Sequence, residues 1–119
     1  MHCIGVDIIE IGRIEKAITR WGERFLKRIY TEKEIELCRN RIASLAAHFA
    51  AKEAAMKALG TKGMRWRDVE ILSSSSGQPV VYLRGEAQSR ARQLGLKGLV
   101  VSLSHCREHA VASVLGETS

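Results

Sequence analysis

Apolar stretches alternate with stretches of helical period along the first quarter of the chain. Residues 3–11 (CIGVDIIEI) are mostly apolar and rich in β-branched side chains, which predicts a buried strand. Apolar residues then recur at helical spacing over 13–20 and 23–29, and Gly22 interrupts the pattern between them. We therefore expect one strand followed by two short helices.

Two further helices are marked by the residues at their ends. The sequence Thr31-Glu32-Lys33-Glu34 is a capping box, in which Thr31 and Glu34 bond each other's backbone amides, and it predicts a helix to about Cys38. Residues 44–59 are rich in alanine, contain no proline or glycine, and are followed by Gly60, which suits the end of a helix. This second segment is the clearest helix of the sequence.

The second half of the chain has the pattern of short strands around one more helix. The expected elements are strands at 68–73, 80–83, 99–103 and 110–115, a turn at Gly77-Gln78-Pro79 and a helix at 85–94. The order β-α-α-α-α-β-β-α-β-β predicts an α+β fold, with a mainly antiparallel sheet packed against a long central helix and shorter helices. The length suits one domain over residues 1–119.

Composition restricts the class of protein without identifying it. The net charge of +6 predicts acidic partners. The three cysteines are widely spaced and odd in number, which disfavours a disulfide framework or a zinc site. No apolar run approaches the roughly 20 residues of a membrane helix, and the first residues lack the pattern of a secretory signal. A cytoplasmic protein without a membrane partner is expected.

Asp7 is a carboxylate in the middle of the first apolar strand, where aspartate is disfavoured. Strand alternation places it on the same face as Gly5 and Ile9. An ionised carboxylate beside such neighbours requires a cation or hydrogen-bond donors. Asp7 is therefore a candidate metal ligand or, alternatively, an aspartate that bonds backbone amides at a strand end.

Glu53 and Lys57 lie four residues apart, on one face of the expected helix 44–59. An ordinary ion pair, worth about 0.3–0.5 kcal/mol, explains this spacing. The pair also suits a magnesium–pyrophosphate site, because Mg²⁺ combines a few carboxylates with substrate phosphates and a lysine adds a positive point charge. His105, at the end of an expected strand, is either a turn residue or a phosphate-binding or acid–base group.

Basic side chains cluster on one side of the two short helices, with Trp21 and Phe25 between them; they are Arg13, Arg20, Arg24, Lys27 and Arg28. This pattern is typical of a solvated face, and it also fits a docking surface for an acidic helix. A small basic nucleic-acid-binding protein is an alternative. It is disfavoured because aromatic residues make up only 5% of the chain and acidic residues interrupt the basic ones.

The candidate residues fall in motifs that together resemble the holo-acyl-carrier-protein synthases, which are 4'-phosphopantetheinyl transferases. Gly5-Val6-Asp7-Ile8-Ile9-Glu10 resembles their GxDxxE motif, and residues 49–61 are similar to their FAxKEAxxKAxGT signature. Gly77-Gln78-Pro79 resembles the GxP turn, while residues 101–105 and 110–112 are similar to the VSxSH and AxA ending. The resemblance covers essentially the whole chain, with the motifs in the family's order.

This resemblance implies the family's reaction and assembly. The reaction is the magnesium-dependent transfer of 4'-phosphopantetheine from coenzyme A to a serine of apo acyl carrier protein in fatty acid biosynthesis, leaving adenosine 3',5'-bisphosphate. The assembly is a homotrimer with active sites at the subunit interfaces. The alternative is a non-catalytic module that binds coenzyme A or a carrier protein. Asp7 and Glu53 count against it, because a pure binder needs no pair of magnesium ligands.

The resemblance also implies residue roles. Asp7 and Glu53 are expected to bind Mg²⁺, and Glu53, a water that it holds, or His105 is the expected base. Lys57 is expected at the phosphate or pantetheine end of coenzyme A, and His105 near the 3'-phosphate. Gly77 and Pro79 are expected to border the adenine.

Two further roles concern basic residues. The family often carries arginine immediately before the phenylalanine of the signature, where this chain has His48. The phosphate contact of that arginine is then expected from His48 or, in its place, from Arg39 or Arg41. The surface expected to receive the acidic recognition helix of the carrier protein consists of Arg13, Arg24, Phe25 and Arg28.

Overall fold

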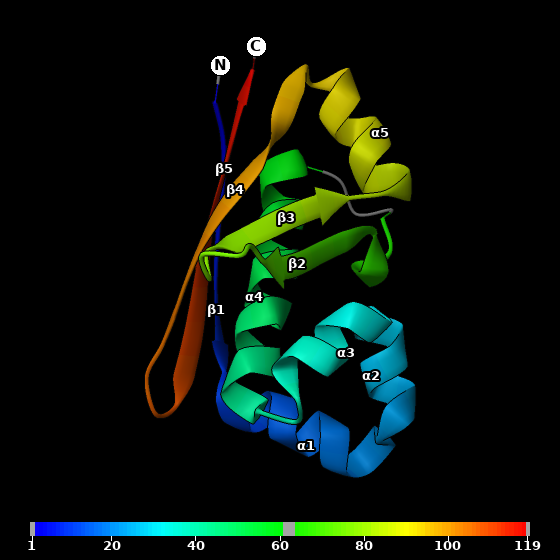
Figure 1. Cartoon of the computed structure of the whole chain (residues 1–119), viewed down its shortest axis with the longest axis vertical. Helices are drawn as coiled ribbons and strands as arrows, with labels where there is room; N and C mark the ends of the chain where they lie inside the picture. Colours follow the sequence, from blue (N-terminus) through cyan, green and yellow to red (C-terminus); the bar gives the residue numbers. More distant parts are fainter. Residues whose placement is uncertain (1, 61–63, 119) are drawn as a thin grey trace.

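A long helix, α4 (Ile42–Leu59), lies along a three-stranded sheet, and the other elements are arranged around this pair (Figure 1). The computed structural model describes residues 2–60 and 64–118. The sheet has the order β1-β5-β4, with both pairings antiparallel, and its strands are β1 (His2–Glu10), β5 (His109–Thr118) and β4 (Leu96–His105).

The remaining elements form two groups. The helices α1 (Ile11–Trp21), α2 (Glu23–Ile29) and α3 (Glu32–Cys38) gather at the N-terminal end of α4 (Figure 1). The other group follows α4 in the chain and comprises a 3-10 helix η1 (Trp66–Asp68), an antiparallel pair β2 (Val69–Ser73) and β3 (Pro79–Leu83), and helix α5 (Gly85–Gln93). Strand β3 packs beside β4. Within the described residues, no helix is long and apolar enough to cross a membrane.

The expected order of helices and strands is confirmed, with small differences at the boundaries. Helix α4 begins two residues earlier than predicted, and β4 and β5 are longer because they pair with each other beyond their apolar centres. The capping box is present, with Thr31 N–H donating to Glu34 Oε1 at 3.1 Å and Glu34 N–H donating to Thr31 Oγ1 at 3.2 Å. Thr61, the last residue of the signature, lies outside the described residues.

The prediction that the first strand is buried is wrong for one of its two faces. Gly5 and Ile9 are buried under α4, as the alternation predicted. Ile4, Val6 and Ile8 point the other way and are 68%, 53% and 64% exposed. A continuous apolar run is typical of a strand covered on both faces, but this chain covers only the α4 side of β1.

Small residues allow α4 to approach the sheet closely. Ala110 and Ala112 on β5 and Ala54 and Ala58 on α4 are all buried in the core. At Gly5 the approach becomes a backbone contact, because a Cβ atom added there would lie 1.8 Å from the carbonyl oxygen of Ala54. Only glycine fits this position, and β1 and α4 are therefore fixed side by side.

Gly5→Ala is expected to destabilise the fold by about 3 kcal/mol or more, because neither backbone can move without disturbing the core. Gly12→Ala is the matched control, since a Cβ atom at Gly12 on α1 meets nothing within 4 Å. It should be neutral or stabilise by up to about 1 kcal/mol through helix propensity. Urea unfolding at one protein concentration measures both effects, and equal stabilities would contradict the backbone contact.

Candidate active site

The contact between β1 and α4 brings Asp7 and Lys57 together. Asp7 lies on the face of β1 that packs against α4, two residues beyond Gly5, and its Oδ1 accepts a hydrogen bond of 2.9 Å from Lys57 Nζ. Lys57 Nζ also donates to the carbonyl oxygen of Val6 at 3.2 Å. The hydrogen bond and charge of Asp7 raise the pKa of Lys57, and the charge of Glu53 adds to this effect. Lys57 is thus a cation held beside two carboxylates.

Glu53 lies one turn before Lys57 on α4 and is partly buried. Burial is the main cause that raises the pKa of Glu53, the negative charge of Asp7 raises it further, and the charges of Lys57 and Arg13 act in the opposite direction. The two carboxylates therefore repel each other across the β1–α4 contact. Such a pair is stabilised by any cation placed between its oxygens.

The chemistry of these donors fits magnesium. Mg²⁺ binds through one or two carboxylates, retains waters and takes its other oxygens from substrate phosphates. The part of the chain that the structure describes has no cluster of three or more His, Cys, Asp or Glu side chains suited to a metal. A metal held by Asp7 and Glu53 would therefore depend on ligands from outside the chain, which is the coordination that a pyrophosphate substrate completes.

A second group of predicted residues lies beside β3 and β4. Gly77 and Pro79 line a pocket of about 280 Å³ together with His48 from α4 and with residues 101–103 of β4. An adjoining pocket of about 540 Å³ is lined by Arg39 and Arg41 and shares Leu72 and Ser73 with the first. The structure thus groups the residues expected around the adenine and phosphates.

His105 is exposed at the last position of β4. His105 pairs with Ala110 of β5, and Ala110 pairs with Ile9 of β1. His105 and Asp7 therefore lie on strands at opposite edges of the sheet. Two strand spacings separate these edges by about 10 Å. The carboxylate pair lies at the β1 edge and the pocket lies beside β4, and we refer to these two places as half-sites.

The residues expected to bind the carrier protein also separate into two places. Arg24, Phe25 and Arg28 line a pocket of about 390 Å³ together with Trp21. Arg13 instead lies close enough to Glu53 that its positive charge partly opposes the rise in the pKa of Glu53. The basic surface on α1 and α2 therefore begins at the carboxylate pair and continues to the Trp21 pocket.

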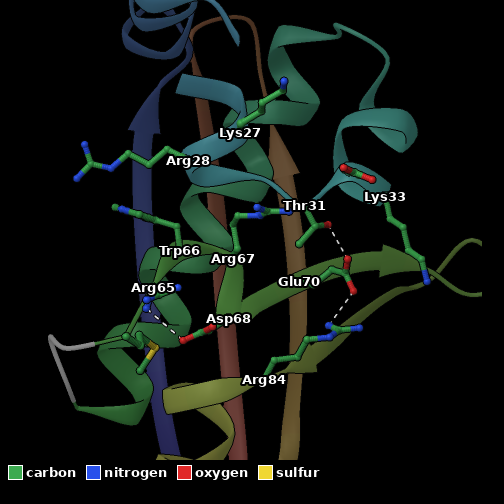
Figure 2. A pocket seen from close by; sticks show the side chains of 12 residues that line it. Lys27, Arg28, Thr31, Lys33, Arg65, Trp66, Arg67, Asp68, Glu70 and Arg84 are labelled. Carbon is green, nitrogen blue, oxygen red and sulfur yellow. Dashed lines mark hydrogen bonds and ion pairs between the residues drawn. The ribbon is translucent and has the colours of Figure 1, made fainter. Parts of the chain in front are cut away.

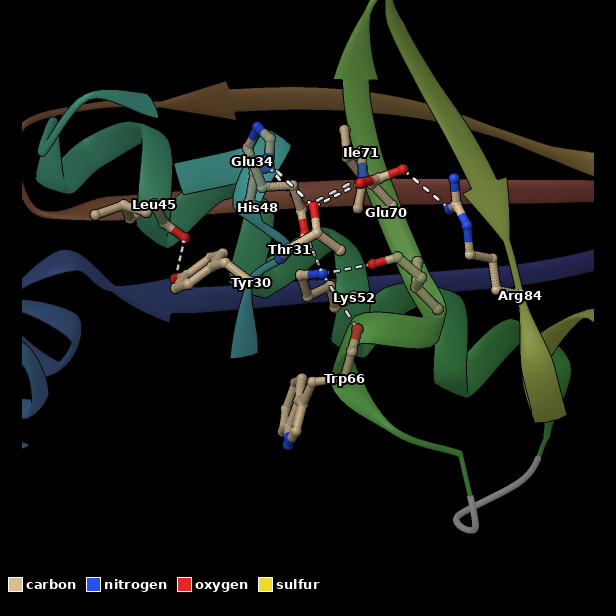
Figure 3. Close-up of polar contacts among 11 residues, drawn as sticks. Tyr30, Thr31, Glu34, Leu45, His48, Lys52, Trp66, Glu70, Ile71 and Arg84 are labelled. Carbon is tan, nitrogen blue, oxygen red and sulfur yellow. Dashed lines mark hydrogen bonds and ion pairs between the residues drawn. The ribbon is translucent and has the colours of Figure 1, made fainter. Parts of the chain in front are cut away.

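A buried charged network behind α4 was not predicted from the sequence. Lys52 is fully buried, and its Nζ donates to Glu34 Oε1 at 2.7 Å, to the carbonyl oxygen of Trp66 at 3.1 Å and to that of Val69 (Figure 3). His48 Nδ1 lies 3.0 Å from Glu34 Oε2, and the N–H of Ile71 donates to the same oxygen at 3.2 Å.

Glu34 and Lys52 form a buried ion pair. Burial lowers the pKa of Lys52, while the charge and the hydrogen bond of Glu34 act in the opposite direction. Burial alone would raise the pKa of Glu34, but the hydrogen bond with His48 and the charge of Lys52 outweigh it and hold the pKa below its usual value. The three acceptors around Lys52 match the three protons of an ammonium group. One signal in the sequence pointed to this burial, because Leu45, Lys52 and Leu59 are spaced by seven residues and so share one face of α4.

Comparisons with known proteins assign the chain to a family. The family model for the 4'-phosphopantetheinyl transferase superfamily matches residues 3–114. The chain therefore belongs to this superfamily, and the resemblance seen in the motifs is confirmed.

Relatives and solved structures give a finer comparison. A protein of Dehalococcoides mccartyi named holo-[acyl-carrier-protein] synthase is 53% identical to this chain, over 95% of this chain and 96% of the relative. A protein of the same name from Herpetosiphon aurantiacus is 48% identical, over 98% of each chain. The Helicobacter pylori synthase, solved with coenzyme A, is 34% identical with a TM-score of 0.87, covering 96% of this chain and 99% of that one. A Bacillus anthracis synthase, solved with coenzyme A (3',5'-ADP), is 34% identical with a TM-score of 0.79, covering 98% and 96%. The α+β fold expected from the sequence is confirmed by these structures.

Lys52→Met is expected to destabilise the fold by about 3–5 kcal/mol, because it leaves the charge of Glu34 buried without its partner. Lys16→Met, at an exposed position on α1, is the matched control and should change stability by less than about 0.5 kcal/mol. Chemical denaturation near neutral pH compares the two variants. A Lys52 variant as stable as the control would show that the network contributes nothing to the fold.

Proposed function

We propose that this chain transfers the 4'-phosphopantetheine arm of coenzyme A to a serine of an apo acyl carrier protein, releasing adenosine 3',5'-bisphosphate. The observation that carries the proposal is the meeting of Asp7, Glu53 and Lys57 at the β1–α4 contact in a member of this superfamily. Two carboxylates and an ammonium group suit a magnesium-bound pyrophosphate. The names of the close relatives agree with this activity.

The proposed step is an in-line displacement at phosphorus. The serine oxygen forms a bond to the β-phosphorus of coenzyme A, the bond from that phosphorus to the bridging oxygen breaks, and the bridging oxygen leaves with adenosine 3',5'-bisphosphate. Asp7 and Glu53 would hold Mg²⁺, which would neutralise pyrophosphate charge. Lys57 supplies a further positive charge to the phosphate oxygens.

The serine proton needs an acceptor. Glu53 is the proposed base, acting directly or through a water that it holds, because its raised pKa makes it a better proton acceptor than an ordinary carboxylate. His105 is the second candidate. The proton is then released to solvent when the carrier protein departs.

Coenzyme A is proposed to span the two half-sites. Its adenine would lie against Gly77 and Pro79, its 3'-phosphate would face His105 with Arg39 or Arg41, and its pyrophosphate would reach Asp7, Glu53 and Lys57. His48 borders the same pocket, although its Nδ1 already contacts Glu34, so its contribution would come from the rest of the ring. The 3',5'-ADP named with the Bacillus anthracis structure is the part of coenzyme A that this pocket would hold.

The half-sites lie at opposite edges of one sheet, which supports an active site shared between subunits. The outer face of that sheet is apolar and open, with Ile4, Val6, Ile8, Val100 and Leu115 between 39% and 68% exposed. Contiguous exposed apolar side chains mark an interface. We propose a homotrimer in which these faces pack together and each β1 edge meets the β4 edge of a neighbour.

Fatty acid biosynthesis in the cytoplasm is the proposed setting. Cys3, Cys38 and Cys106 are free thiols, which agrees with a reducing compartment. The substrate in that setting is the apo form of the acyl carrier protein.

Intact-protein mass spectrometry tests the activity. Apo acyl carrier protein is incubated with this protein, coenzyme A and Mg²⁺, with and without a chelator. A gain of one phosphopantetheine that the chelator abolishes is the expected result. If the protein binds coenzyme A but none of several carrier proteins gains mass, the chain is a non-catalytic binding module and the proposed activity is wrong.

Asp7→Asn and Glu53→Gln should each lower turnover by at least about 100-fold, because each removes a charged oxygen ligand of the metal. Both variants should keep their circular dichroism spectrum and unfolding midpoint, since neither residue belongs to the buried network. Glu117→Gln, exposed at the far end of β5, is the control and should leave turnover unchanged. Wild-type turnover in either test variant at limiting Mg²⁺ would disprove the metal assignment.

Ile4→Lys combined with Ile8→Lys should convert the trimer to monomers and abolish turnover, because two charges would be buried in the interface. Gln88→Lys, exposed on α5, is the control and should leave both mass and turnover unchanged. Light scattering after size exclusion gives the mass. A wild-type monomer with full activity would contradict the shared site.

A further inference from the structure

The pocket beside α2, α3 and η1 has a volume of about 730 Å³, and none of the residues that line it belongs to the family motifs (Figure 2). Six cationic side chains line it, from four stretches of the chain: Lys27, Arg28, Lys33, Arg65, Arg67 and Arg84. We refer to it as the basic pocket. Such a concentration of positive charge in a concave surface attracts an anionic ligand.

Two of the acidic residues that line the basic pocket, Glu70 and Asp68, have partners within its wall. Glu70 is buried and its Oε1 lies 2.9 Å from Arg84 Nη1, so this ion pair closes one side of the pocket. Asp68 Oδ2 accepts a hydrogen bond of 3.2 Å from the backbone N–H of Arg65. The side chains of Arg65 and Arg67 are exposed, so a ligand can reach them. Figure 2 shows Arg65 across from the Glu70–Arg84 pair, and Arg67 between them with its side chain pointing toward Thr31.

A row of aromatic rings joins the basic pocket to the proposed docking surface. Phe25 and Phe49 stack with centroids 6.5 Å apart, and Phe49 and Trp66 stack at 4.7 Å. Phe25 lines the Trp21 pocket and Trp66 lines the basic pocket, while Arg28 lines both. The two pockets are therefore parts of one surface, with an apolar ridge flanked by cations.

This surface also leads to the candidate active site. Phe49 precedes Glu53 by one turn on α4, so the middle of the aromatic row lies on the same side of the helix as the carboxylate. A ligand seated across both pockets would pass close to the reacting groups. A protein substrate that presents a serine needs this kind of placement.

The chemistry of the surface selects an acidic, amphipathic protein segment. An apolar ridge between cations matches a helix with apolar residues on one face and carboxylates at its borders. A nucleic acid fits less well, because the carboxylates of Glu32, Asp68 and Glu70 interrupt the positive wall that a continuous phosphate chain would follow.

We propose that the basic pocket is a second docking site for the carrier protein, in which Arg65 and Arg67 bind an acidic segment next to the helix received by Arg24, Phe25 and Arg28. The inference rests on the proposed function, because the carrier protein is the partner assumed. A second contact beside the first strengthens encounter with the partner and its binding, without acting on the reacting groups. Charges outside the reacting centre act mainly on encounter and binding.

Charge reversal tests the inference. Initial rates of the wild-type protein and of the double variant Arg65→Glu/Arg67→Glu are measured against apo carrier protein at saturating coenzyme A, and against coenzyme A at saturating carrier protein. The expected result is a KM for carrier protein raised about 10-fold or more, with kcat and the KM for coenzyme A unchanged. The milder Arg65→Gln/Arg67→Gln variant should raise the KM for carrier protein by a smaller factor, and it tests the same contact if the reversal disturbs folding.

The matched control is Gln88→Glu/Ser89→Glu/Arg92→Glu, which makes the same change in net charge at exposed positions of α5 outside the basic pocket. If the KM for carrier protein rises equally in this control, net charge alone explains the result of the double variant and the inference is overturned. If the KM for coenzyme A of the double variant rises as much as its KM for carrier protein, the pocket binds the nucleotide instead. If the double variant loses binding of RNA while its kinetics are unchanged, the pocket binds nucleic acid. Either result overturns the inference. If the wild-type protein modifies no carrier protein at all, the proposed function itself fails, which is a different result from unchanged kinetics in the variant.

Discussion

The backbone of β1 touches the backbone of α4 at Gly5, and the positions of Asp7, Glu53 and Lys57 relative to one another follow from this contact. Because no Cβ atom fits between Gly5 and the carbonyl of Ala54, the strand and the helix have one relative placement. Asp7 then lies two residues farther along the same face and reaches Lys57. An alanine-rich helix surface serves the same purpose, since larger side chains would separate the two elements.

The opposite side of α4 is fixed by charge rather than by close packing. Lys52 and Glu53 are consecutive, so they point in different directions, and Lys52 enters the network with Glu34 while Glu53 points toward Asp7. Removing either partner of a buried pair is strongly destabilising. The network also ties α3 and β2 to α4, which places the walls of the basic pocket relative to the carboxylate pair.

Local patterns predicted most of the fold. The capping box at Thr31 and the glycine after Leu59 located the ends of helices correctly. The unusual carboxylate in an apolar strand marked Asp7 as a candidate metal ligand, and the structure brings it to Lys57, while its role stays a prediction. The exposed face of β1 was missed because an apolar run does not show which of its faces the same chain covers. The partners of Lys52 were missed because they are mostly backbone carbonyls and a distant carboxylate, which no local spacing encodes. The basic pocket was missed for a related reason, since its arginines come from segments far apart in the sequence.

The central claim is that the β1–α4 contact forms the metal site. Its most direct test is an anomalous difference map from crystals grown with coenzyme A and Mn²⁺, an ion that accepts the same oxygen ligands as Mg²⁺. The account predicts one strong peak, bound by the carboxylates of Asp7 and Glu53 and by the pyrophosphate, with the adenine against Gly77 and Pro79 of a neighbouring subunit. A peak held by other side chains, or coenzyme A bound with no metal between these two carboxylates, would contradict it.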